Sequence, residues 1–119
     1  MPKKILIADD NHGELAMMQS LFEGRGYTVI TAVNGEEAVE KALKEKPDII
    51  VLDVQMPIMD GDEAAMHLKS KEETKRIPII FVTGLRTERE IEENKEEDIF
   101  AKPIKLEAFL NKVKVLVGT

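Results

Sequence analysis

The sequence predicts an α/β domain built on a parallel β-sheet, and three observations support this fold class. Short segments rich in Val, Ile and Leu alternate with longer segments whose apolar residues recur at helical spacing, which is the order of β-α-β units. Residues 49–52 form an unbroken apolar run, as expected for a strand covered on both faces. A chain of 119 residues is long enough for a hydrophobic core, and we assign residues 1–119 to one domain.

The order of the expected elements specifies the topology. Strands are expected at residues 4–8, 28–32, 49–52, 79–82 and 99–101. Helices are expected at residues 11–25, from the N-cap Asn34 to the residue before Pro47, after the Asp60-Gly61 turn, and at residues 105–117. Five such units with right-handed crossovers predict a flavodoxin-like, doubly wound sheet in the order 2-1-3-4-5, with helices on both faces. In the last helix, Leu106 and Phe109 have core spacing.

The segment between the fourth and fifth strands predicts only a weak helix. Its sequence, "GLRTEREIEENKEED", has Leu85 and Ile91 as its large apolar residues. Because packing of an apolar face is what stabilises most protein helices, we expect a fourth helix that is short, shifted or mobile.

Polar side chains stand at the ends of four predicted strands. Asp9 and Asp10 follow the first, Asp53 the third, Thr83 the fourth and Lys102 the fifth. The C-terminal ends of the strands line one crevice in an open parallel sheet, so these groups are expected to converge. Three carboxylates, a hydroxyl and an ammonium can together hold a divalent cation and a phosphoryl group.

Four motifs identify a family that this chain resembles. In order along the chain they are "ILIADDN", "PDIIVLDVQMPIMDG", "IPIIFVTG" and "AKPI". Their order and approximate spacing resemble the receiver domain of two-component response regulators, and the resemblance covers the whole chain. It implies a protein that takes a phosphoryl group from a sensor histidine kinase or phosphotransfer protein and signals to a downstream protein or output domain. It also implies that the chain turns over no external metabolite.

The resemblance further implies a metal site and a phosphoacceptor. Asp53 would be the phosphoacceptor, a nucleophile that forms an acyl phosphate. Mg²⁺ would be held by Asp10 directly, by Asp9 mostly through water, by an oxygen of Asp53 and by the backbone carbonyl of Gln55.

Thr83 and Lys102 would bind the phosphoryl group in the same family pattern. Lys102 would pair with Asp53 at rest, and the Lys102–Pro103 peptide bond is expected to be cis. Leu85 would border the route of the attacking water, where an apolar side chain is expected to slow hydrolysis of the acyl phosphate.

One departure from the family pattern concerns signalling. The position three before the Lys is usually aromatic in the family, and here it is Ile99, which has no ring to swing inward. Phe100 is adjacent but should face the opposite side of the sheet, because side chains alternate along a strand. We hypothesise that signalling depends on ordering of residues 85–98 more than on a side-chain swing.

Two other classes of protein share parts of this pattern. A pseudo-receiver, which has the same fold but serves as a docking module without phosphorylation, stays open because of Ile99 and the weak fourth helix. A metal-dependent phosphatase of the haloacid-dehalogenase type also uses Asp, Thr and Lys. That family carries Asp-x-Asp on its first strand, whereas this chain has Asp9-Asp10 and no cap insertion.

Composition excludes several functions. The formal net charge is −6, and residues 88–98 carry seven acids against Arg89 and Lys95, so direct nucleic-acid binding is not expected. No apolar run reaches the roughly 20 residues that span a bilayer. With no cysteine and no room for a signal peptide before the first strand, we expect a cytoplasmic protein.

Overall fold

The computed structural model describes residues 2–93 and 98–118 and contains one five-stranded sheet. The sheet order is β2-β1-β3-β4-β5, and every neighbouring pair is parallel. The predicted flavodoxin-like topology is therefore confirmed. The strands are β1 (Lys4–Ala8), β2 (Thr28–Ala32), β3 (Ile49–Asp53), β4 (Ile79–Thr83) and β5 (Ile99–Ala101). The helices are α1 (His12–Glu23), α2 (Gly35–Glu45), α3 (Gly61–Lys69), α4 (Glu88–Glu93) and α5 (Leu106–Val117).

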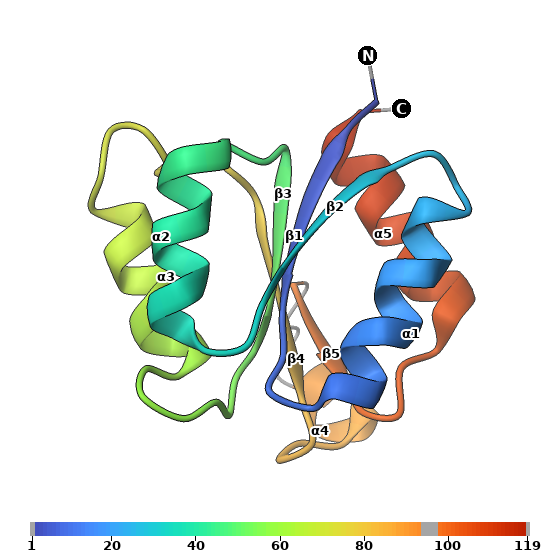
Figure 1. Cartoon of the computed structure of the whole chain (residues 1–119). Helices are drawn as coiled ribbons and strands as arrows, with labels where there is room; N and C mark the ends of the chain where they lie inside the picture. Colours follow the sequence, from blue (N-terminus) through green and yellow to red (C-terminus); the bar gives the residue numbers. More distant parts are fainter. Residues whose placement is uncertain (1, 94–97, 119) are drawn as a thin grey trace.

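The helices form two layers around the twisted sheet. Figure 1 shows α1 and α5 on one face, α2 and α3 on the other, and α4 beside the lower ends of β4 and β5. The core is accordingly divided into two clusters. One packs Phe22 and Phe109 against the sheet, and the other packs Leu6, Leu52 and Leu68.

The central strand β3 explains why the core has two halves. All five of its residues are buried. Ile49 and Val51 belong to the cluster under α1 and α5, whereas Ile50 and Leu52 belong to the cluster under α2 and α3. This alternation is the period of two that a strand imposes, and it is why the run had to be apolar without a break.

The described helices give no candidate for a membrane span, since none combines the necessary length with the necessary apolar character.

Side-chain caps set the start of α1, α2 and α3. Each N-cap oxygen accepts a hydrogen bond from the backbone N–H three residues later, which satisfies a donor that the helix itself leaves unpaired. The pairs are Asn11 with Glu14, Asn34 with Glu37, and Asp60 with Glu63. The predicted N-cap at Asn34 is thus confirmed.

The fourth helix is short, as predicted, and it has a local reason to form. Thr87 Oγ1 accepts from the N–H of Glu90, and a Glu90 carboxylate oxygen accepts from the N–H of Thr87. This reciprocal pattern is a capping box. Ile91 is buried and anchors the helix to the core. Residues 94–97, which belong to the segment 85–98 whose ordering we hypothesise to carry the signal, lie outside the described residues.

The fifth strand shows the expected alternation of side chains. Phe100 packs edge-on against Phe109 of α5, with ring centroids 5.1 Å apart. Ile99 is partly buried and lies beside Phe81 in the parallel register, and Phe81 packs against the cluster under α2 and α3.

The expectation that Leu106 is a core residue is wrong. Its side chain is 41% exposed, because it occupies the first residue of α5, directly after the loop that follows β5. Phe109, one turn later, is fully buried.

A close approach of two backbone segments requires glycine at position 61. A Cβ atom added to Gly61 would collide with the carbonyl oxygen of Asp53. The Gly61 N–H donates to the carbonyl of Val54 at 2.9 Å, so the start of α3 is held against the end of β3.

We predict that Gly61→Ala lowers the free energy of unfolding by about 1–3 kcal/mol, because the added methyl group must push two backbone segments apart. Gly84→Ala is the matched control, since a Cβ there meets no atom within 4 Å and should change stability by less than about 0.5 kcal/mol. Urea unfolding of both variants measures the difference. Equal stabilities would contradict the close approach.

Candidate functional site

The predicted site residues meet at the C-terminal edge of the sheet, which is the lower edge in Figure 1. Asp53 and Thr83 are the last residues of β3 and β4, and Lys102 directly follows β5. The parallel register places Asp53 opposite Val82, and the backbone N–H of Lys102 donates to the carbonyl of Thr83 at 2.8 Å. The sheet itself therefore brings together residues that are far apart in the sequence.

Three carboxylates form the acidic part of this site. Each of Asp9, Asp10 and Asp53 offers an oxygen, and these oxygens lie within 4.8 Å of one another. Asp9 and Asp53 are buried, with 8% and 6% exposure, whereas Asp10 is exposed. Such a set of oxygen donors fits a hard divalent cation such as Mg²⁺.

Backbone amides hold two of these carboxylates in place. The N–H of Asn11 donates to Asp9 Oδ1 at 2.9 Å, and the N–H of Gln55 donates to Asp53 Oδ1 at 3.3 Å. Gln55 thus lies beside the cluster, and the role of its carbonyl as a metal ligand stays a prediction.

The ammonium of Lys102 lies among three carboxylates. Its Nζ atom is 3.0 Å from Asp53 Oδ2, 3.4 Å from Asp9 Oδ2 and 2.7 Å from Glu14 Oε2. The Lys102–Pro103 peptide bond is cis, as expected. Lys102 therefore supplies positive charge directly beside the predicted phosphoacceptor.

Glu14 is the member of the site that sequence reasoning missed. It stands in the first turn of α1, three residues after the N-cap Asn11, so its side chain lies close to the end of β1. An acid in the helical turn that directly follows Asp9-Asp10 was the available signal. In the sequence this acid resembles an ordinary first-turn glutamate that favours the helix dipole.

Burial and charge shift the pKa values of these groups. Burial raises the pKa of Asp9 to about 7, and a hydrogen bond with Glu14 and the charge of Asp53 act in the same direction, against the opposing effects of the Asn11 amide and Lys102. Burial alone would lower the pKa of Lys102, but the carboxylates of Glu14, Asp53 and Asp9 outweigh it and raise that pKa. The hydrogen bond from Lys102 lowers the pKa of Glu14.

Thr83 supplies the hydroxyl at this edge. It is 2% exposed, and its Oγ1 accepts a hydrogen bond from the N–H of Leu85 at 3.0 Å. A hydroxyl has one donor as well as acceptor positions, so Thr83 keeps a proton to donate to a ligand. The side chain of Leu85 is 61% exposed.

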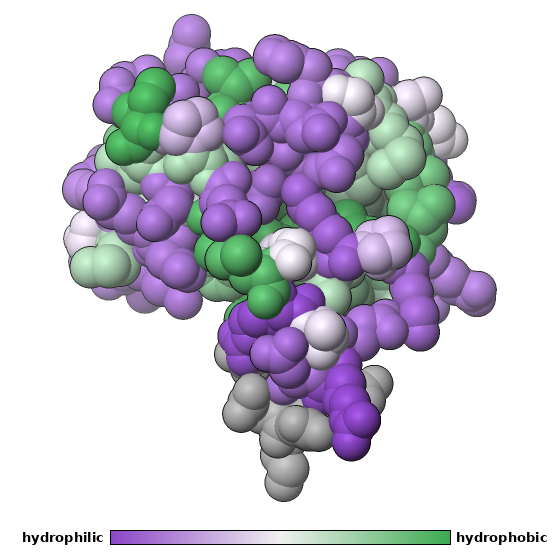
Figure 2. All heavy atoms as spheres, turned by 90° about the horizontal axis from the view of Figure 1, so that it is seen from below, coloured by the Kyte–Doolittle hydropathy of each residue, from purple (hydrophilic) through white to green (hydrophobic). Residues whose placement is uncertain are grey.

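A cavity of about 280 Å³ opens beside Asp53 and Lys102. Its remaining walls are mostly apolar and include Met17, Pro103 and Leu106. The molecule seen from this edge is mainly hydrophilic, with hydrophobic side chains showing between the hydrophilic ones (Figure 2).

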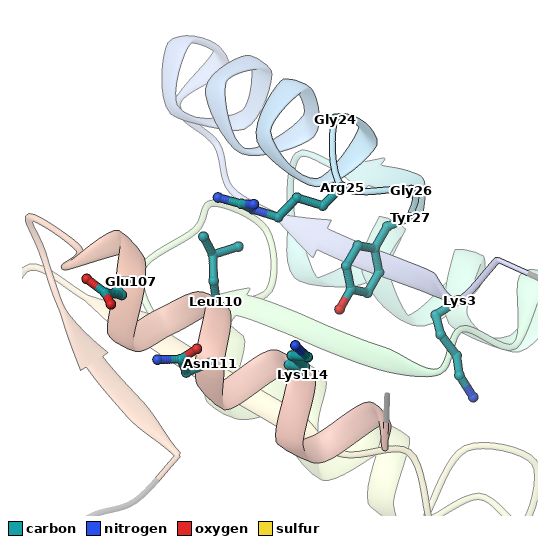
Figure 3. Close-up of a pocket in the computed structure, with 9 residues that line it drawn as sticks. All are labelled: Lys3, Gly24, Arg25, Gly26, Tyr27, Glu107, Leu110, Asn111 and Lys114. Carbon is teal, nitrogen blue, oxygen red and sulfur yellow. The ribbon is translucent and has the colours of Figure 1, made fainter.

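A larger cavity, of about 640 Å³, lies at the opposite edge of the sheet. Figure 3 shows it between α5 and the turn that joins α1 to β2, with Arg25, Tyr27 and Lys114 among its lining residues. It contains Glu107 but no cluster of carboxylates, so its size does not make it the site of the chemistry predicted from Asp53.

The fold and the site together define a class of protein, a flavodoxin-like domain with an acidic centre at the C-terminal edge of its sheet. Comparison with known families identifies the family within this class. Residues 5–114 match the model of the response regulator receiver domain, and the chain belongs to this family. Membership excludes the haloacid-dehalogenase alternative.

Individual relatives agree with this assignment. The chain is 34% identical to the polar-differentiation response regulator DivK of Brucella anthropi, over 99% of this chain and 98% of that protein. It is also similar to the receiver domain of the sensor histidine kinase PA1611 from Pseudomonas aeruginosa, whose structure has a magnesium ion coordinated in the active-site cleft. That match has 26% identity and a TM-score of 0.85 over the full length of both chains. A chain of the CheX–CheY–BeF3–Mg complex of Borrelia burgdorferi matches with 28% identity and a TM-score of 0.83, over 98% of this chain and 90% of that one.

The raised pKa of Asp9 predicts how the stability of the metal-free chain depends on pH. The folded state binds this proton more tightly than the unfolded state, whose Asp carboxyl has its ordinary pKa of 3.8. The stabilisation that the proton provides is complete below that value and is lost as the pH rises toward about 7.

Asp9→Asn should therefore stabilise the metal-free chain relative to the native one, by about 1–2 kcal/mol at pH 8 and by much less at pH 4. Urea unfolding in the presence of a chelator measures this difference. Saturating Mg²⁺ should reduce the advantage of the variant, since the metal needs the carboxylate. A stability difference that does not change with pH would contradict the assigned pKa.

Proposed function

We propose that this receiver domain accepts a phosphoryl group on Asp53 from a sensor histidine kinase or phosphotransfer protein, with Mg²⁺ at the acidic centre. The observation that carries the proposal is the position of Lys102 Nζ, 3.0 Å from Asp53 Oδ2, at the edge of a cluster of three aspartates. Family membership supports the same function. The large cavity in Figure 3 has no part in it.

The proposed reaction transfers one phosphoryl group. A carboxylate oxygen of Asp53 attacks phosphorus, the bond from phosphorus to the donor nitrogen breaks, and the donor imidazole keeps the electron pair and takes up a proton. The product is an acyl phosphate on Asp53. Such a transfer needs charge neutralisation and alignment more than it needs covalent help from the protein.

The charges of the chain itself are arranged for this neutralisation. Asp9, Asp10, Asp53 and the backbone carbonyl of Gln55 would hold Mg²⁺, which supplies positive charge next to the phosphoryl oxygens when it is bound. Lys102 donates to a second phosphoryl oxygen, and Thr83 donates its hydroxyl proton to a third.

The output of this domain is protein–protein contact that depends on phosphorylation. The face made by α4, β5 and α5 is the surface that we assign to a downstream protein or output domain, because Thr83 and Lys102 lie at its edge. The chain acts only on its own aspartyl phosphate and has no external metabolite as substrate.

We predict that incubation with a small phosphodonor and Mg²⁺ adds one phosphoryl group to the native chain. The Asp53→Asn variant should gain none, since its amide is not a nucleophile for this reaction, and a chelator should prevent the gain in the native chain. Intact mass spectrometry measures all three cases. A native chain that gains no phosphoryl group under any condition would overturn the proposal and indicate a docking module with the same fold.

Leu85 should determine how long the phosphoryl group persists. Its exposed apolar side chain follows Thr83 by two residues, where it can keep attacking water from the acyl phosphate. We predict that Leu85→Glu shortens the lifetime of the phosphorylated chain several-fold, and that Leu85→Met leaves it nearly unchanged. The loss of mass after removal of the donor gives both lifetimes, and equal lifetimes in the native chain and Leu85→Glu would contradict this role.

A further inference from the structure

Glu14 makes the shortest contact with the central lysine. Its Oε2 atom is 2.7 Å from Lys102 Nζ, against 3.0 Å for Asp53 and 3.4 Å for Asp9. We infer that Glu14 is a positioning residue that tethers Lys102 in the unphosphorylated chain and must release it when a phosphoryl group binds. The release of Lys102 by Glu14 rests on the function proposed above, whereas the contact that tethers Lys102 in the unphosphorylated chain does not.

The hydrogen-bonding capacity of Lys102 is the first reason. An ammonium has three N–H donors, and here three carboxylates accept from them. A phosphoryl oxygen that binds Lys102 must therefore compete with these acceptors. Because the carboxylate of Asp53 itself becomes part of the acyl phosphate, the competing carboxylates are those of Glu14 and Asp9.

Exposure identifies the acceptor that leaves. The side chain of Glu14 is 41% exposed, whereas those of Asp9 and Asp53 are 12% and 7% exposed. A carboxylate that leaves the lysine needs water to solvate its charge, and the more exposed Glu14 is better placed for this than Asp9. Glu14 can thus give up its contact with Lys102 at a smaller cost in free energy than Asp9 can.

The negative charge of Glu14 indicates that this residue opposes the binding of a phosphoryl group. Glu14 adds a further negative charge beside a site that already has three carboxylates. A phosphoryl group is itself anionic, so Glu14 both competes with it for Lys102 and repels it. Removal of the charge on Glu14 should therefore favour the phosphorylated form and any anionic mimic of it.

A matched control is available on another helix. Glu63 follows the N-cap Asp60 by three residues, as Glu14 follows Asn11, and its N–H makes the same capping bond. It is exposed, and its carboxylate has no ion pair among the described residues. Glu14→Gln and Glu63→Gln therefore make the same change in net charge at equivalent helix positions.

The first experiment measures the affinity of the chain for beryllium fluoride, an anionic phosphoryl mimic, at saturating Mg²⁺ by NMR titration. Glu14→Gln should bind the mimic roughly two- to fivefold more tightly than the native chain, which is the size of one partly exposed ion pair. Glu63→Gln should match the native chain. An affinity of Glu14→Gln that equals or falls below that of Glu63→Gln would overturn the release.

The second experiment tests the tether without any phosphoryl chemistry. An amine-reactive label, with its sites read by mass spectrometry, reports how available Lys102 is in the metal-free chain relative to a lysine remote from the site, such as Lys69. We expect faster labelling of Lys102 in Glu14→Gln than in Glu63→Gln or the native chain, and equal rates would overturn the tether. If the native chain binds no mimic but the labelling differs, the proposed function fails while the tether stands.

Discussion

The concentration of negative charge around one ammonium is the constraint on which the rest of this structure depends. Asp9, Asp53 and Glu14 all contact Lys102, and Asp10 lies next to them. Carboxylates at this separation repel one another, and burial deprives two of them of water. Lys102 offsets part of that repulsion, and a divalent cation would offset more. The folded chain is thus organised around a site in which four carboxyl groups lie beside the ammonium of Lys102.

The scaffold tolerates this repulsion because its centre is rigid. Asp53 ends a strand that is buried along its whole length and packed on both faces. The start of α3 lies against the carbonyl of Asp53, at a position where only glycine fits. Backbone amides from Asn11 and Gln55 fix the orientation of two carboxylates. The buried strand and the close approach at Gly61 cannot shift without loss of core packing, and the two amides add to this support. The carboxylates therefore stay together although they repel one another.

The sequence was sufficient for the sheet and for most of the site because both depend on local patterns. Apolar runs placed the strands, and the polar residues at their ends met because parallel strands end at one edge. The contact between Glu14 and Lys102 joins residues 88 apart, and it depends on how α1 is rotated over the sheet, which no local pattern encodes. The exposure of Leu106 depends in the same way on the path of the loop after β5. The capping box of α4 could have been recognised in the sequence from Thr87 and Glu90. The scarcity of large apolar residues in this segment predicted only that the helix would be weak.

The hydrogen bond between Leu85 and Thr83 offers a route from the site to the surface that does not need an aromatic side chain at position 99. Thr83 Oγ1 already accepts from the backbone of Leu85, so a change in the direction of this hydroxyl changes the hydrogen bond that holds the next loop. That loop leads within a few residues to Thr87, whose capping box starts α4. The helix α4 is short, and its capping box, the buried Ile91 and the ion pair between Glu88 and Lys105 are among the interactions that hold it. A change at the start of so short a helix acts on a large part of it. Under the proposed function, donation from Thr83 to a phosphoryl oxygen would therefore act on the backbone of residues 84–88. The signal would then require no movement of the Ile99 side chain.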